Sequence, residues 1–366
     1  MKACLPFNPP LAHSARMTKS HIFAPAERAF CREHFPHATA RDWNDWRWQL
    51  RHRLRTPDAV AQCLPLSRKE QMALAKPEMW RMPLAITPYV MSLLALAPPD
   101  SPLRRTYLPD TREGCVSPGE FRDPLGEEAH EVANGLIQSY PHKVLLLATR
   151  DCACFCRFCT RARTTGTTKC YNSRADPFWW LERRVEIRDV LVSGGDPLTL
   201  GDAEVERILR KLRAIPHLQL IRIGTKAPAS LPQRITPALV KILKRYPPLW
   251  LSLHFTHPAE LTPRAATACA RLRDAGLPLM NQTVLLRGIN DDLDTLRELN
   301  EGLLRMGVKP YYLHQGDLAA GTAHLRSTPA KGRAILRAMA GTVSGYAIPL
   351  FMRDPPGGGA KTQLPV

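Results

Sequence analysis

The chain has 366 residues, of which 44% are hydrophobic and 23% charged, a composition typical of a globular protein with a sizeable core. Its formal net charge is +18, so nucleic acid has to be weighed as a partner. No apolar run approaches the roughly 20 residues that a membrane-spanning helix needs, and the amino terminus lacks the apolar core and cleavage site of a secretory signal. We therefore expect a cytoplasmic protein with no membrane partner.

The first third of the chain predicts a helical region. Residues 1–40 show no clear periodicity, so we expect a loosely ordered lead-in there. Helical spacing begins within 41–135, whose second half is rich in turn residues and predicts a connector. The apolar residues of the first helical stripe recur three and four positions apart: Trp43, Trp46, Leu50 and Leu54.

Residues 136–342 alternate between short apolar runs and helical segments, which predicts right-handed βαβ crossovers and a parallel sheet. Six runs are expected as strands, at 144–149, 189–193, 218–225, 249–255, 279–286 and 309–315. Helices are expected near 201–214, 236–246, 262–275, 292–306 and 328–341. Six units predict a partial (β/α)6 barrel of the α/β class, with catalytic groups at the carboxyl ends of the strands. Residues 343–366 are expected to add a C-terminal strand and an arm.

Four of the ten cysteines fall within eight residues, directly after the first predicted strand. Such clustering favours a metal or redox site over a disulfide framework. Cys152, Cys156 and Cys159 form a CxxxCxxC pattern, and three thiolates suit a 4Fe–4S cluster whose fourth iron is open to a small molecule. A structural zinc site would need a fourth ligand, and the sequence has no second CxxC. We interpret Cys154, which alternates with the others, as a packing residue that points away.

The CxxxCxxC spacing is typical of radical S-adenosylmethionine (SAM) enzymes, in which the open iron binds the amino and carboxylate groups of the methionine part. A second motif supports this hypothesis. Ser193, Gly194, Gly195 and Asp196 follow the second predicted strand, where glycines permit close backbone approach to a ligand. Alone, this motif is equally typical of a tight turn. One strand after the cysteines, it is the expected seat of the methionine ammonium.

Near the carboxyl terminus, three glycines and an alanine precede Lys361. Taken alone, this arm favours a flexible tail that carries a solvated lysine. The alternative is a lysine that forms a Schiff base with pyridoxal 5′-phosphate (PLP), which needs an amine free to swing away.

From about Trp43 to its end the chain resembles the lysine 2,3-aminomutase family. The resemblance lies in blocks that follow one another in one order: DWNDWRWQLRHRL, PLAITPYVMSLL, YPHKVLLLATRDCACFCRFCTRAR, VLVSGGDPL, IRIGTKAPASLPQRIT, GLPLMNQTVLLRGIND, PYYLHQGDLAAGTAHLR and SGYAIPLFMRDPPGGGAK. It implies a radical SAM barrel with a 4Fe–4S cluster, SAM and PLP as cofactors. It also implies a reducing partner such as flavodoxin or ferredoxin, and it allows a homo-oligomer.

The resemblance also implies roles for single residues. The three cysteines of the CxxxCxxC pattern are the expected cluster ligands, and Lys361 is the expected PLP lysine. Arg161 matches the arginine that binds the substrate carboxylate, for which a planar guanidinium is suited. Asp317 and Asp354 match the two carboxylates that receive the terminal ammonium of the substrate, and such a pair would disfavour an acidic side chain.

Departures from the family pattern fall mainly around the cofactor. Tyr140 is present, but Ser139 and Lys143 stand beside it where the family commonly has arginines. Lys226 replaces an arginine in another block, and we expect Tyr140 and Lys226 to bind the cofactor. His314 stands where an aromatic residue is common. Because lysine cannot form the paired hydrogen bonds of a guanidinium, we expect these changes to affect how PLP is bound more than which class of reaction is catalysed.

The expected reaction moves the 2-amino group of a basic L-amino acid to C3, with L-lysine as the leading substrate. Arginine is the alternative, because a guanidinium also fits a pair of carboxylates. A radical SAM enzyme that modifies RNA is a further alternative, favoured by the charge of +18; it predicts salt-sensitive RNA binding and no use for Lys361. The basic residues are spread along the whole chain, so we expect no nucleic-acid partner.

Overall fold

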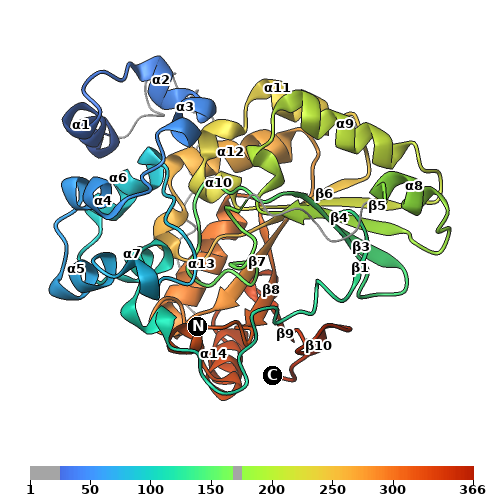
Figure 1. Cartoon of the computed structure of the whole chain (residues 1–366). Helices are drawn as coiled ribbons and strands as arrows, with labels where there is room; N and C mark the ends of the chain where they lie inside the picture. Colours follow the sequence, from blue (N-terminus) through green and yellow to red (C-terminus); the bar gives the residue numbers. More distant parts are fainter. Residues whose placement is uncertain (1–24, 168–174) are drawn as a thin grey trace, which may run out of the picture.

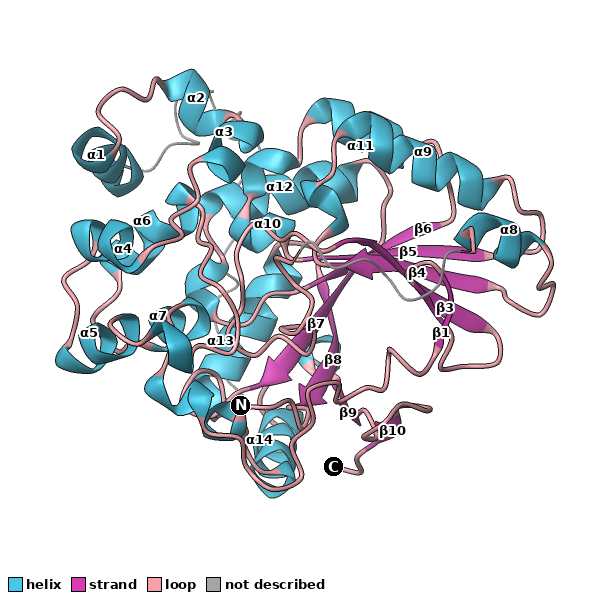
Figure 2. Cartoon of the chain, in the orientation of Figure 1, coloured by secondary structure: helices cyan, strands magenta, loops and turns pink. Residues whose placement is uncertain are grey.

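The computed structural model describes residues 25–167 and 175–366, so the first 24 residues of the expected lead-in lie outside the described part. One sheet of ten strands follows the chain order from β1 at one edge to β10 at the other (Figures 1 and 2). Among the described residues, no helix combines the length and the apolar character that a bilayer crossing requires.

Six consecutive parallel strands form the wall of the barrel: β3 (Lys143–Thr149), β4 (Asp189–Gly194), β5 (Leu220–Thr225), β6 (Leu249–Leu253), β7 (Leu279–Leu285) and β8 (Lys309–Gln315). The helices between and after them are α8 (Pro177–Glu182), α9 (Asp202–Arg213), α10 (Ala227–Ser230), α11 (Pro237–Leu243), α12 (Pro263–Asp274), α13 (Leu293–Arg305) and α14 (Pro329–Ala340). Short 3-10 turns lie at η4 (Pro197–Thr199), η5 (Pro232–Arg234), η6 (Pro258–Glu260), η7 (Ala323–Leu325) and η8 (Gly345–Ala347). The predicted partial (β/α)6 barrel is therefore confirmed.

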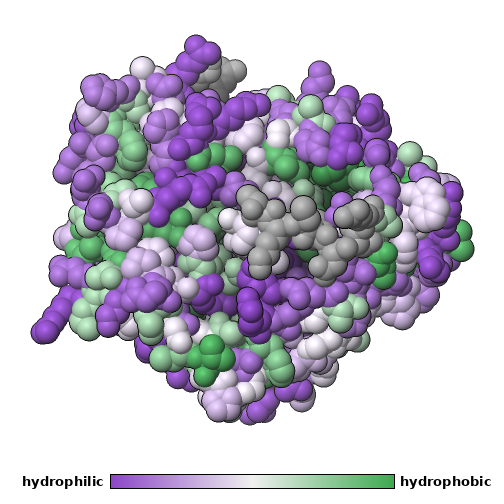
Figure 3. All heavy atoms as spheres, viewed as in Figure 1, coloured by the Kyte–Doolittle hydropathy of each residue, from purple (hydrophilic) through white to green (hydrophobic). Residues whose placement is uncertain are grey.

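Burial explains why these helices cover the sheet. In α9 the apolar residues Val205, Ile208, Leu209 and Leu212 are buried, and they recur at helical spacing. They belong to one large core shared with the inward residues of the strands. The opposite face of α9 is charged, and hydrophilic side chains accordingly line α9 and α11 on the surface (Figure 3).

The N-terminal region is a separate layer of short helices beside the barrel, drawn in blue in Figure 1. It comprises α1 (Pro25–His34), α2 (Ala40–Asn44), α3 (Trp46–Arg51), α4 (Pro57–Cys63), α5 (Arg68–Leu74), η2 (Pro77–Met79), α6 (Pro88–Leu96), α7 (Pro102–Tyr107) and η3 (Thr111–Gly114). This layer has its own core, in which Phe30 and Cys31 of α1 are buried with Trp43. That packing explains an ordered helix within the segment that we expected to be loosely ordered.

The stripe that predicted one helix is split into α2 and α3. The side chain of Asp45 accepts the backbone N–H of Arg47 at 2.8 Å, and an aspartate in this position begins a new helix. Trp43 is fully buried on α2, and its indole N–H donates to Glu27 at 2.7 Å. The apolar spacing thus identified the buried face correctly, whereas the capping residue inside it decides where the helix is interrupted.

Near the carboxyl terminus, the arm between the last two strands connects the two edges of the sheet. At one edge, β1 (Glu131–Ala133) and β2 (Leu136–Ile137) precede β3; at the other, β9 (Leu350–Arg353) follows β8 and pairs with β10 (Thr362–Gln363). The arm between β9 and β10 reaches the first edge, because Gly357 N donates to Pro124 O at 3.1 Å. The backbone N of Lys361 also donates to the Tyr140 hydroxyl at 3.0 Å. The predicted arm therefore bridges the open side of the barrel.

Candidate active site

The three cysteines of the CxxxCxxC pattern lie in the loop that leaves the carboxyl end of β3. Burial raises the pKa of the Cys152 thiol well above its usual range, and the charges of Asp196, Cys159 and Cys156 raise it further. Burial also raises the pKa of Cys156 to about 12, and Cys159 adds to that increase. The charge of Cys159 thus acts on both Cys152 and Cys156, which indicates that the three side chains lie near one another.

This environment fits an iron–sulfur cluster. A buried thiol that resists ionisation becomes a thiolate when metal coordination supplies positive charge. In the described residues, no three His, Cys, Asp or Glu side chains converge as ligands of a single metal ion. A 4Fe–4S cluster does not ask for such convergence, because its cysteines bind different irons. Cys152, Cys156 and Cys159 are therefore suited to hold the cluster.

Cys154 packs into a hydrophobic core, as we expected. Its side chain is 4% exposed and packs into the core of the N-terminal layer. Its sulfur accepts the backbone N–H of Thr87 at 3.3 Å. Cys154 thus contributes to the packing of the N-terminal layer, against which Cys156 also lies.

The turn after β4 packs directly on the start of the cysteine loop. The backbone N of Gly195 donates to Thr149 O at 2.6 Å, and that of Asp196 donates to Asp151 O at 2.7 Å. A Cβ atom on Gly195 would lie 2.1 Å from Asp151 O, so no other residue fits there. The close approach that we predicted for these glycines is thus made to protein backbone. Contact of Ser193, Gly194 or Gly195 with SAM stays a prediction.

Asp196 and Lys226, two of the predicted cofactor residues, have other partners. The carboxylate of Asp196 is buried and accepts hydrogen bonds from Thr225 Oγ1 at 2.7 Å and from Lys226 N at 2.8 Å. It therefore ties the turn after β4 to the turn after β5. Lys226 Nζ lies 2.7 Å from a carboxylate oxygen of the buried Glu260 and donates to His254 O at 3.0 Å. Both side chains are thus engaged by protein groups. Direct binding of a cofactor by either residue stays a prediction.

A cavity of about 170 Å³ lies where the two edges of the sheet meet. Its polar lining comes from both edges and from the barrel wall: Glu127, Ser139, Tyr140, Lys143, Arg161, Arg222, Asp354 and Lys361. Three of the predicted site residues besides Lys361 are thus brought together here, namely Tyr140, Arg161 and Asp354. Lys226 is not among the residues that line it.

The cavity fits PLP by its chemistry. Lys361 offers a primary amine inside it, and Lys143 Nζ lies over the ring of Tyr140, 3.7 Å from the centroid. Lys143 and Arg222 supply two cations that a phosphate group can use. Arg222 also pairs with Asp189, through Nε at 2.9 Å. Arg222, which sequence reasoning did not single out, therefore adds positive charge where the family arginines beside Tyr140 are missing.

The acidic side of the site holds the lysine amine. Lys361 Nζ donates to both carboxylate oxygens of Asp354, at 2.7 and 2.6 Å. Burial raises the pKa of the nearby Asp317 to about 7, and the charge of Asp354 adds to this effect while Lys361 opposes it. Burial lowers the pKa of His314 to about 3, so it stays neutral 3.6 Å from Asp354. The two predicted aspartates thus act on one another and on the lysine.

Arg161 is held by Glu127, a residue that sequence reasoning missed. Arg161 Nε donates to the two oxygens of Glu127 at 2.8 and 3.0 Å, and its Nη1 donates to Gly194 O at 3.2 Å. Burial by itself would raise the pKa of Glu127, but the charges of Arg161 and Arg163 keep that pKa below its usual range. Glu127 lies in the turn-rich connector, where no periodicity pointed to it.

The chain is similar to known proteins along most of its length. The sequence model of the radical SAM superfamily matches residues 146–299. The chain is 43% identical to the L-lysine 2,3-aminomutase of Fusobacterium nucleatum, over 90% of this chain and 78% of that protein. It is 42% identical to the L-lysine 2,3-aminomutase of Clostridium subterminale, over 91% and 80%. It is also 38% identical to the glutamate 2,3-aminomutase of Clostridioides difficile, over 89% and 78%.

Proposed function

The chain belongs to the lysine 2,3-aminomutase family of radical SAM enzymes, and we propose that it moves the 2-amino group of L-lysine to C3. The observation that carries this choice of substrate is the contact between Lys361 Nζ and Asp354, at 2.6 and 2.7 Å. Asp354 there binds a primary alkylammonium, the group that ends the side chain of lysine. The half-buried Asp317 lies near enough to interact with both groups, although it does not itself line the cavity, and it supplies a second carboxylate.

An acidic substrate fits this subsite poorly. A carboxylate that entered beside Asp317 and Asp354 would meet two like charges with little water to screen them. The relative named glutamate 2,3-aminomutase shows that the family also includes an enzyme with an acidic substrate. The aspartate pair therefore supports a cationic amino acid for this chain.

The cofactors of this family are a 4Fe–4S cluster, SAM and PLP. When bound, the cluster and SAM supply a radical that abstracts hydrogen, and PLP carries the amino group that migrates. We propose that Cys152, Cys156 and Cys159 hold the cluster and that Lys361 holds PLP, with Lys143 and Arg222 facing its phosphate. The cluster also needs an electron, for which we propose a flavodoxin or ferredoxin as donor.

Residues of the cavity, together with the neighbouring Asp317, would position the substrate at its two ends. Arg161 would bind the α-carboxylate through its guanidinium, which Glu127 holds in place. Asp317 and Asp354 would bind the terminal ammonium. A substrate fixed at both ends would keep C2 and C3 at one position in the cavity.

A substrate panel tests this proposal. Purified enzyme, reconstituted without oxygen and supplied with a chemical reductant, SAM and PLP, is incubated with L-lysine, L-arginine or L-glutamate. We expect β-lysine as the product, detected by chromatography and mass spectrometry. Product from arginine alone would replace lysine as the substrate, since the carboxylate pair also suits a guanidinium. No β-amino acid from either cation would refute the proposed activity.

The RNA alternative predicted no use for Lys361. That lysine lies in the cavity with Tyr140 and Asp354, and the relatives are aminomutases. The visible absorbance of bound PLP, lost in Lys361→Ala, separates the two functions directly.

A further inference from the structure

The cysteine loop packs against the N-terminal layer at several points. Phe155 N donates to Ala85 O and Arg157 N donates to Thr106 O, both at 3.0 Å. The segment around Met82 and Ala85 packs on Phe155, and the side chains of Cys152 and Cys159 touch the same apolar cluster. The N-terminal helices are therefore part of the support of the proposed cluster site.

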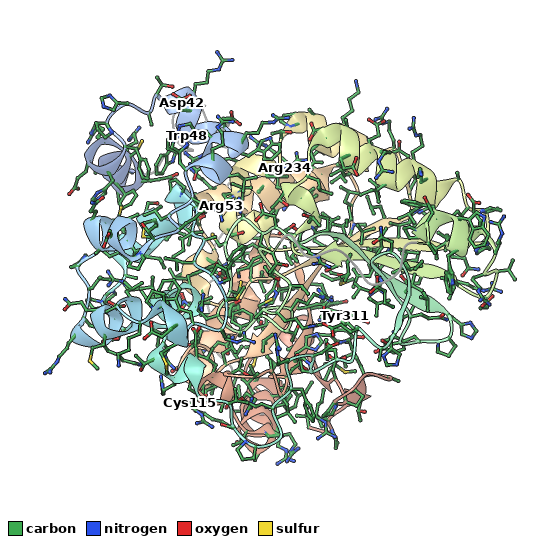
Figure 4. The ribbon with its side chains drawn as sticks, viewed as in Figure 1. Asp42, Trp48, Arg53, Cys115, Arg234 and Tyr311 are labelled. Carbon is green, nitrogen blue, oxygen red and sulfur yellow. The ribbon has the colours of Figure 1, made fainter. Side chains whose placement is uncertain are left out.

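Arg53 grips the first cysteine of the loop. It follows α3 and lies at the boundary between the N-terminal layer and the barrel (Figure 4). Its Nη1 donates to Cys152 O at 2.5 Å, and its two terminal nitrogens pair with the two oxygens of Asp151 at 2.6 and 2.9 Å. Asp151 Oδ1 in turn accepts the N–H of Cys152 at 3.0 Å. This pair thus binds both the N–H and the C=O of Cys152.

Arg81 grips the last cysteine of the loop. It follows η2, and its Nη1 donates to Cys159 O at 2.9 Å and to Arg157 O at 3.0 Å. Its Nε donates to Ala320 O at 3.0 Å, which lies beyond β8. One planar guanidinium thus fixes the end of the cysteine loop relative to the other side of the barrel.

We propose that Arg53 and Arg81 are positioning residues that hold the backbone of the first and last cluster cysteines in place for iron. This inference rests on the proposed cluster ligands. A rigid guanidinium fork fixes carbonyl direction better than a flexible side chain does, and it lowers the entropy that the loop loses when it binds a cluster. Groups that orient metal ligands typically change metal affinity by about 10- to 100-fold when they are removed.

The same layer offers a matched control. Arg104 on α7 is fully buried and donates to Leu94 O at 2.9 Å, to Pro65 O at 2.8 Å and to Glu70 at 3.1 Å. It makes the same kinds of bonds as Arg53 and Arg81, but none of these bonds reaches the cysteine loop. Arg104→Gln therefore reports what the loss of a buried arginine does to the fold alone.

The experiment compares Arg53→Gln, Arg81→Gln and Arg104→Gln with the unchanged protein after anaerobic reconstitution. The measurements are iron content, the rate at which a chelator removes iron, the paramagnetic resonance spectrum of the reduced cluster, and the Tm of the cofactor-free chain. We expect Arg53→Gln and Arg81→Gln to lose iron at least about tenfold faster than Arg104→Gln at a comparable Tm. Equal rates in all three variants, or rates that follow Tm alone, would overturn the proposal.

Two more variants separate the remaining explanations. Arg81→Lys keeps the charge but not the fork, so it should lose iron nearly as fast as Arg81→Gln if the arginine acts by fixing direction. Iron retained at the original rate in Arg81→Lys would contradict that role. Cys152→Ala should fail to assemble the cluster. If Cys152→Ala assembles an unchanged cluster, the ligand set is wrong, whatever the arginine variants show.

Discussion

Binding of the proposed cationic substrate should depend on pH through Asp317. Burial and the neighbouring Asp354 raise the pKa of this carboxyl to about 7. An ammonium group binds the ionised form, so affinity should rise as the pH rises through that pKa. A carboxyl with this pKa is ionised to roughly one tenth at pH 6 and nine tenths at pH 8, so we expect a change of about ninefold in apparent affinity.

The assay is the change in PLP absorbance when L-lysine is added to the PLP-loaded enzyme without SAM. L-norleucine provides the matched control, because it shares the α-amino and carboxylate groups but lacks the terminal ammonium. Its affinity should lack the step near pH 7 that lysine shows. In Asp317→Asn, the step for lysine should disappear, and affinity at pH 8 should fall by roughly 1.5–3 kcal/mol.

A third variant checks the cause of the raised pKa. In Asp354→Asn, one negative neighbour of Asp317 is removed, so the midpoint of the remaining step should move to lower pH. The reasoning fails if lysine and norleucine show the same dependence on pH. It also fails if Asp317→Asn keeps a step near pH 7.

Four further outcomes follow. The raised pKa of Asp317 favours its protonated form in the folded state, so the free energy of unfolding of the cofactor-free protein should fall as the pH rises from about 4 to 7. The fall should amount to at most roughly 4 kcal/mol, and it should be absent in Asp317→Asn when both proteins are unfolded with urea. Glu127→Gln should raise KM for the amino acid more than it lowers kcat, because Arg161 loses its partner; an unchanged KM would speak against this role. Cys154→Ala should keep the iron content of the unchanged protein while lowering stability by about 1–2 kcal/mol in denaturant unfolding. Lys361→Ala should lose the absorbance of bound PLP and keep the iron–sulfur bands.

The strands and helices of the barrel could be predicted because each is a local pattern. A run of apolar residues forms a buried parallel strand, and apolar residues at helical spacing form a covering helix, whatever lies elsewhere in the chain. The break between α2 and α3 could not be predicted in this way, because one polar side chain, Asp45, caps a new helix inside a continuous apolar stripe. The spacing of apolar residues predicts which face of a helix is buried, but it does not predict where a capping residue interrupts that helix.

The candidate site residues that the sequence could point to stand in motifs or in blocks that resemble the family, whereas others came into view only with the fold. Lys361 and the cysteines stand in recognisable sequence contexts, and resemblance supplied Asp354 and Arg161. Glu127 has no such context, because it becomes a partner of Arg161 only after the connector folds over the barrel. The pairing of Lys226 with Glu260 likewise follows from the fold, and a cofactor contact of Lys226 stays a prediction.

In the arm that bridges the edges of the sheet, the backbone and the side chain of Lys361 bind different partners. The backbone N–H donates to Tyr140, whereas Nζ donates to Asp354 and is the atom that would exchange partners if Lys361 holds PLP as we propose. Gly357, Gly358 and Gly359 have φ angles of 77°, 97° and 111°, so these glycines give the arm a defined shape that residues with side chains would resist. We therefore expect the amine to swing while the main chain stays seated. In the proposed function, Lys361 could then release PLP while its backbone stays bound to Tyr140.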